Sequence, residues 1–234
     1  MTAINMFVQP KGRAGYIVAD CAITDADGTL RESCAKVAYN TGRFPYAIGV
    51  TGNVHPVIFV KAMGAANIMS MKQLIKRLPE VMRAAMASAT IESALAPSEA
   101  QLGLKGVAWD FRAKRPIGFV MVSDPIMHPG CEPFTFYETD FALAKWDGAE
   151  TVADMIGANV DITDPDKFDA ERDGLKLIEK QRIQPCTTLI PSVDQAVKHR
   201  IGGEAHLYRV TKNGVFAEQL CDWPDEIGRK ICPL

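Results

Sequence analysis

The sequence Y-I-V-A-D-C-A-I-T-D at residues 16–25 places one aspartate, Asp20, in an otherwise apolar run. Runs of four to eight apolar residues bounded by turn residues are typical of buried strands. Similar runs stand at residues 3–8, 35–39 and 48–54, and turns rich in Pro, Gly and Asp separate them. Because a buried carboxylate needs a partner, Lys36 in the third run is a candidate to pair with Asp20. We therefore expect four strands in two successive hairpins.

The rest of the chain shows helical and strand patterns in blocks. Helices are expected at residues 56–64, 70–93, 149–156, 166–184 and 192–199, and strands at residues 102–111, 116–123, 134–146, 205–211 and 215–220. Pro79 is expected to kink or restart the second helix, and Asp164-Pro165 to begin the fourth. Blocks of strands separated by blocks of helices favour antiparallel sheets over an alternating parallel sheet. The fold class is therefore α+β.

Length and composition are those of an ordinary globular domain. The chain has 234 residues, 47% hydrophobic and 23% charged, with a formal charge of −2. These values favour a single domain spanning residues 1–234. The charge gives no sign of nucleic-acid binding. The sequence contains no apolar run of membrane-spanning length and no signal-peptide pattern, so we expect no membrane partner and a cytoplasmic location.

Cysteine and histidine spacing indicates no metal site and no cofactor. The six cysteines form no C-x-x-C pair and the four histidines are dispersed. Reduced thiols and an absence of metal are therefore expected. Cys21 beside Asp20 and Cys34 near Lys36 are noted as thiols that could lie near a site, although buried structural cysteines are the commoner case.

The order Thr2, Asp20, Lys36 and Gly52 resembles the start of the proteasome β-subunit family. That family includes the peptidase subunit of the bacterial ATP-dependent protease and belongs to the N-terminal-nucleophile (Ntn) hydrolases. The segment I-G-G-E-A-H-L-Y-R-V-T-K-N-G at residues 201–214 looks like that family's glycine-pair strand and hairpin. The resemblance implies a four-layer αββα sandwich of two antiparallel sheets. It also implies a threonine hydrolase that cleaves peptide or amide bonds.

The chemistry of that family would assign a role to each matching residue. Removal of Met1 would expose Thr2, whose α-amine is a built-in base because its reference pKa is about 7.7 to 8.0. Lys36 would lower the pKa of the amine or the hydroxyl, and Asp20 would keep Lys36 charged and oriented. With Gly52, these three residues are the expected catalytic group.

The resemblance also implies residues that contact the substrate. The backbone N–H of Gly52 would donate to the oxyanion, an interaction worth about 3 to 4 kcal/mol in the transition state. Thr24 and Asn53 would meet the backbone of a peptide or protein substrate. Assembly into a homo-oligomeric ring, fed by an ATP-dependent unfoldase, is the partner expectation.

Two departures from the family pattern keep other functions open. The Gly-Ser-Gly turn of active members is absent, with residues 145–148 a poor substitute, and Lys198 and Ile201 replace an Asp and a Ser before the glycine pair. A catalytically inactive structural or interaction subunit of the same fold is therefore an alternative. An unrelated α+β binding domain is the third.

Overall fold

The computed structural model describes residues 3–92, 96, 99–145, 151–185 and 198–233. Two five-stranded sheets and one two-stranded sheet make up its β structure, and every pair of neighbouring strands within them is antiparallel. This confirms the expectation of an α+β protein with antiparallel sheets. Among the described residues, no helix combines the length and the apolar character that crossing a bilayer requires.

The first sheet combines the start and the end of the chain. Its strands, in spatial order, are β10 (Phe141–Ala142), β1 (Ile4–Gln9), β2 (Ala14–Asp20), β11 (Glu204–Thr211) and β12 (Gly214–Asp222). The hairpin of β1 and β2 pairs Ile4 with Ala19, and β11 pairs Ala205 with Asp20. The last segment of the chain therefore lies directly beside the strand that carries Asp20.

The second sheet is built from the middle of the chain. Its spatial order is β5 (Val37–Asn40), β6 (Tyr46–Gly52), β7 (Leu102–Asp110), β8 (Arg115–Val122) and β9 (Tyr137–Glu138). The expected hairpins at 35–54 and 102–123 are both present. A small additional hairpin, β3 (Ala22–Thr24) with β4 (Leu30–Ser33), leaves the first sheet directly after β2.

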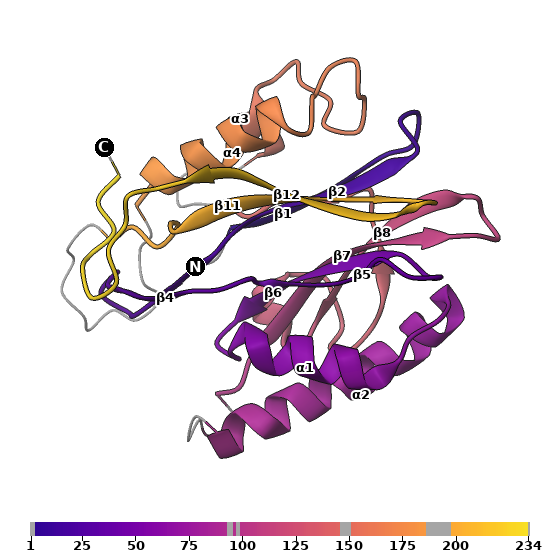
Figure 1. Ribbon diagram of the computed structural model, residues 1–234, viewed down its shortest axis with the longest axis horizontal. Helices are drawn as coiled ribbons and strands as arrows, with labels where there is room; N and C mark the ends of the chain where they lie inside the picture. Colours follow the sequence, from indigo (N-terminus) through magenta and orange to yellow (C-terminus); the bar gives the residue numbers. More distant parts are fainter. Residues whose placement is uncertain (1–2, 93–95, 97–98, 146–150, 186–197, 234) are drawn as a thin grey trace.

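The two sheets face each other across an apolar core, and helices cover their outer faces (Figure 1). On β1, Ile4, Met6 and Val8 pack in the cluster between the sheets, whereas Phe7 packs on the side of the helix α4 (Arg172–Ile183). Successive strand residues point to opposite faces, and both faces of β1 are buried. This explains why residues 3–8 read as a continuous apolar run.

Two helices lie on the outer face of the second sheet. They are α1 (Pro56–Ala66), with Pro56 in its first turn as expected, and α2 (Met71–Glu92). The expectation that Pro79 restarts the second helix is wrong, because α2 is one helix of 22 residues that contains Pro79. Burial of Leu74, Leu78 and Met82 along one stripe outweighs the cost of an interior proline, about 3 kcal/mol.

On the first sheet's outer face lie α3 (Val152–Ile156) and α4 (Arg172–Ile183). Helix α3 begins after Thr151, which forms a capping box with Asp154. The expected strand at 134–146 is reduced to the two-residue strands β9 and β10, which follow a short 3-10 helix, η1 (Pro125–Met127), in the chain. The helix expected at 192–199 falls mostly on residues outside the described ranges.

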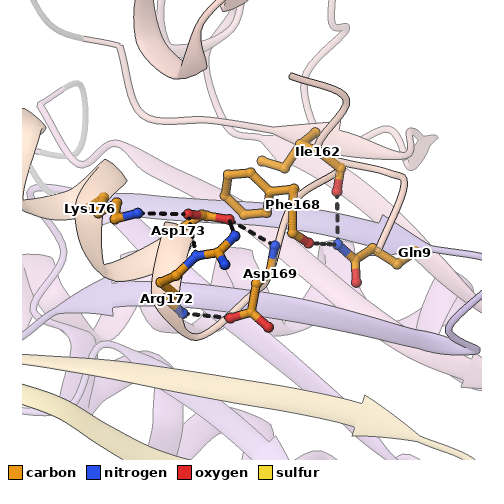
Figure 2. Close-up of polar contacts among 7 residues, drawn as sticks. All are labelled: Gln9, Ile162, Phe168, Asp169, Arg172, Asp173 and Lys176. Carbon is orange, nitrogen blue, oxygen red and sulfur yellow. Dashed lines mark hydrogen bonds and ion pairs between the residues drawn. The ribbon is translucent and has the colours of Figure 1, made fainter. Parts of the chain in front are cut away.

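Helix α4 begins later than expected, because residues after Pro165 make other contacts (Figure 2). The Asp169 carboxylate accepts from the N–H of Arg172 at 2.7 Å, and the Asp173 carboxylate accepts from the N–H of Asp169 at 3.0 Å. Arg172 holds the pKa of Asp173 well below its usual range. Gln9 on β1 donates to the carbonyls of Ile162 and Phe168, at 3.2 and 2.7 Å, which fixes the preceding loop.

Candidate active site

Asp20 and Lys36 form a fully buried ion pair. Lys36 Nζ lies 2.8 Å from Asp20 Oδ1, and neither side chain has any exposed surface. Asp20 ends β2 and Lys36 immediately precedes β5, so the two residues come from different sheets. The structure thus brings together two of the expected catalytic residues at the place where the sheets meet.

The Asp20 carboxylate also binds backbone N–H groups from both ends of the chain. Oδ1 accepts from the N–H of Ala3 at 3.0 Å, and Oδ2 accepts from the N–H of Gly202 at 3.4 Å. Ala3 is the residue that follows Thr2 in the sequence. Thr2 itself lies outside the described residues. The peptide nitrogen next to Thr2 is therefore tied to the same oxygen that binds Lys36.

Gly52 ends β6, the strand next to Lys36. Its φ of 114° favours glycine. A Cβ at this position would lie 2.2 Å from the carbonyl oxygen of Gln101, so no side chain fits there. The carbonyl of Lys36 accepts from the N–H of Val50, at 2.9 Å, on the same strand. This bond links the end of β6 to the ion pair.

The two expected substrate contacts, Thr24 and Asn53, lie on different elements. Thr24 is partly buried at the end of β3. The Asn53 side chain donates to the carbonyl of Glu99 at 2.6 Å and accepts from the N–H of Gln101 at 2.7 Å. Since the N–H of Asn53 also binds Gln101, this residue anchors the 99–101 segment beside Gly52. Its contact with a substrate stays a prediction.

A second buried ion pair supports the glycine pair at residues 202–203. Arg182 binds Asp225 with two hydrogen bonds, at 2.7 and 2.8 Å, and donates to the carbonyl of Ile201 at 2.8 Å. Asp225 also accepts from the N–H of Gly203 at 2.9 Å. Sequence reasoning missed this pair, whose members are 43 positions apart. A Cβ on Gly202 would lie 2.3 Å from the Asp225 carboxylate, so a residue with a side chain does not fit beside this ion pair.

Replacing Arg182 by lysine is expected to lower the free energy of unfolding by about 2 to 3 kcal/mol, because an ammonium cannot reproduce a buried two-bond contact. The matched control is Arg172→Lys. Arg172 also pairs with an aspartate, but 65% of its side chain is exposed, so its change is expected to stay within about 0.5 kcal/mol. Urea denaturation of both variants measures this. Equal losses of unfolding free energy in the two variants would show that the buried Arg182–Asp225 pair stabilises the fold no more than the exposed Arg172–Asp173 pair.

The cysteines near the site are poor nucleophiles in their present surroundings. Burial raises the pKa of Cys21 to about 12, and burial also raises the pKa of Cys34. A thiol reacts as its thiolate, so neither supports covalent catalysis. All described cysteines are unpaired, and Cys186 lies outside the described residues.

Two of the four histidines, His55 and His206, each lie close to a cysteine and a glutamate in the folded chain. Cys21, Glu204 and His206 form one trio of potential metal ligands, and Glu32, Cys34 and His55 form another. In each trio the ligand atoms lie within 4.8 Å of one another. Sequence spacing did not indicate either trio, because in each the histidine and the cysteine come from different segments of the chain.

Two of the positions that depart from the family pattern, Lys198 and Ile201, are buried. Lys198 is 4% exposed, and its ammonium has no hydrogen-bond partner in the described part of the chain. Ile201 is buried beside the first sheet. Residues 146–148 lie outside the described ranges. The polar groups that active family members carry before the glycine pair therefore have no equivalent among these side chains.

No family model and no curated protein sequence matches this chain. Solved structures do. Anbu (ancestral beta-subunit) from Yersinia bercovieri has a TM-score of 0.56 at 10% identity, covering 94% of this chain and 88% of that one. An Anbu (Gly-1) mutant from Hyphomicrobium sp. strain MC1 has a TM-score of 0.58 at 14% identity, covering 96% and 89%. At these identities the likeness shows the fold alone, a proteasome-related one.

These matches correct the family expected from the sequence. The similar structures are Anbu proteins, which are related to the proteasome β-subunit family but distinct from it. Assignment to the proteasome β-subunits or to the bacterial protease subunit was therefore wrong. The physical reason is that the matching residues, Asp20, Lys36 and Gly52, all lie where the two sheets meet. A shared site of this kind does not separate one relative of the fold from another.

Proposed function

We propose that this protein is an N-terminal threonine hydrolase of Anbu-like fold, which cleaves peptide or other amide bonds after Met1 is removed. One observation carries the proposal. Asp20 Oδ1 accepts from Lys36 Nζ at 2.8 Å and from the N–H of Ala3 at 3.0 Å. A single buried carboxylate thus orients the lysine and the backbone next to Thr2, which is what a nucleophile at the second residue requires.

The proposed reaction begins with proton transfer within Thr2. Its α-amine takes the hydroxyl proton while the oxygen attacks the amide carbonyl, and the same proton later goes to the departing amine. The Lys36 ammonium favours the ionised hydroxyl, and the N–H of Gly52 would donate to the oxyanion. Water then hydrolyses the ester that joins the acyl group to Thr2.

The remaining expectations are part of the same proposal. The finer architecture is a four-layer αββα sandwich, in agreement with the helices on both outer faces in Figure 1. Thr24 and Asn53 would flank a peptide substrate. A homo-oligomeric ring and an ATP-dependent unfoldase as its partner stay predictions.

A second candidate function is a catalytically inactive subunit of the same fold, with a structural or interaction role. Lys198 and Ile201 favour it, because they stand where active members of the expected family carry acidic and hydroxyl groups. In that case the buried Asp20–Lys36 pair would have a structural role alone, and its loss would still destabilise the fold.

The direct test is turnover of a panel of fluorogenic peptidyl amides by untagged protein, with Thr2→Ala and Thr2→Ser variants in parallel. The threonine hydrolase predicts measurable amine release in the wild type, reduced release in Thr2→Ser and none in Thr2→Ala. Equal background release by all three proteins would support the inactive subunit.

A further inference from the structure

A cavity of about 600 Å³ opens beside the proposed oxyanion turn. Thr51 and Gly52, the last residues of β6, form one wall, and Met127 and Leu143 contribute apolar surface. A space of this size accommodates one side chain of a substrate or a small molecule. Because Gly52 belongs both to this wall and to the proposed oxyanion site, a group in the cavity would belong to the same substrate.

The polar lining of this cavity is basic. Lys105, His128 and Lys145 all border it, and no aspartate or glutamate does so among the described residues. His128 and Lys145 are exposed at the rim, whereas Lys105 is partly buried. Three basic side chains around an apolar space, with no carboxylate among the described residues that line it, suit an anionic group.

Lys105 borders the cavity and also contacts the N-terminal strand β1. Its side chain projects from β7 towards the first sheet, and its ammonium donates to the carbonyl of Ile4 at 2.9 Å. Ile4 follows Ala3, whose N–H binds Asp20. Burial lowers the pKa of Lys105 to about 7, and no carboxylate of the described residues offsets this effect. A ligand carboxylate would supply the missing counter-charge.

We propose that this cavity binds a carboxylate side chain on the acyl side of the scissile amide, with Lys105 as the residue that determines this specificity. The substrate class is therefore amides of glutamyl or similarly acidic acyl groups. This inference rests on the proposed threonine hydrolase, since the cavity is assigned to a substrate through Gly52. The carboxylate would pair with Lys105, while the apolar wall would pack against its methylene groups.

Ligand-detected NMR titration tests the cavity without requiring turnover. The probes are N-acetyl-glutamate α-amide and N-acetyl-glutamine α-amide, which have nearly the same shape and differ in one charge. At pH 6.5 we expect the glutamate probe to bind about tenfold more tightly, as for one charge-assisted contact. Lys105→Met should reduce the ratio to about 1. Lys61→Met, which removes an exposed lysine of α1, should keep the ratio.

The pH dependence gives a second signature. The charge on Lys105 in the free protein is lost as pH rises through about 7, so the glutamate preference should fall between pH 6.5 and 8.5. His128 and Lys145 are the other titratable groups on this cavity. Because imidazoles also lose charge as pH rises, the profile is repeated in His128→Gln, where the fall should persist.

The outcomes separate this inference from the proposed function. Equal affinity for the two probes, or a preference that survives Lys105→Met, would overturn the acidic specificity even if Thr2 reacts. A Lys105-dependent glutamate preference in a protein whose Thr2 is inert would contradict the substrate assignment and leave only an anion-binding cavity. When both tests succeed, peptidyl amides with glutamate before the scissile bond should be cleaved about tenfold faster, as kcat/KM, than those with glutamine.

Discussion

Insertion of one alanine between Met1 and Thr2 is expected to abolish amide hydrolysis while the free energy of unfolding stays unchanged. Removal of Met1 then exposes the inserted alanine, and Thr2 keeps its hydroxyl but loses its free α-amine. A threonine hydroxyl without a base is a weak nucleophile. We therefore expect at least a thousandfold fall in turnover, as found when a nucleophile loses its base.

The insertion is compared with Thr2→Ser, which keeps both a hydroxyl and a terminal amine and should keep a measurable part of the activity. Urea denaturation of both variants checks that the fold persists. If the insertion variant still cleaves at the wild-type rate, the base is not the α-amine, and the mechanism drawn from Thr2 is wrong.

Replacement of Lys36 by methionine is expected to lower the free energy of unfolding by about 3 to 5 kcal/mol, because it leaves the Asp20 carboxylate buried without its cation. Both side chains are fully buried in the wild type, so water cannot replace the lost partner without a structural change. The proposed reaction would also be lost, since Lys36 is the cation that favours the ionised hydroxyl.

A double variant isolates the cause. In Asp20→Asn with Lys36→Met, no charge remains, and the asparagine oxygen still accepts from the N–H of Ala3 or of Gly202. We expect this protein to be more stable than Lys36→Met alone, by about 1 to 3 kcal/mol. The prediction fails if the free energy of unfolding of Lys36→Met lies within about 1 kcal/mol of the wild-type value. It also fails if adding Asp20→Asn lowers the stability further.

Sequence patterns predicted the parts of this fold that depend on local chemistry. The strand runs at 3–8, 102–111 and 116–123 reflect burial of both faces, and the helix that starts at Pro56 reflects helix-start chemistry. The nomination of Lys36 as the partner of Asp20 also succeeded, because few charged residues interrupt these runs and a buried charge requires a partner.

Features that depend on distant contacts were missed. The Arg182–Asp225 pair joins α4 to the C-terminal segment, and no local pattern relates the two residues. Lys105 is one polar residue in an apolar strand, like Asp20, but its partner is a backbone carbonyl that sequence does not reveal. The late start of α4 follows from Gln9 on β1 holding the preceding loop.

Intact-mass spectrometry of untagged protein from cells, before and after incubation with a threonine-directed β-lactone, tests the central claim most directly. Opening of the lactone by the hydroxyl of Thr2 forms an ester and adds the mass of the whole reagent. The account predicts a chain without Met1 that gains one such adduct, located on Thr2 by peptide mapping. A chain that keeps Met1 and gains no adduct would contradict it.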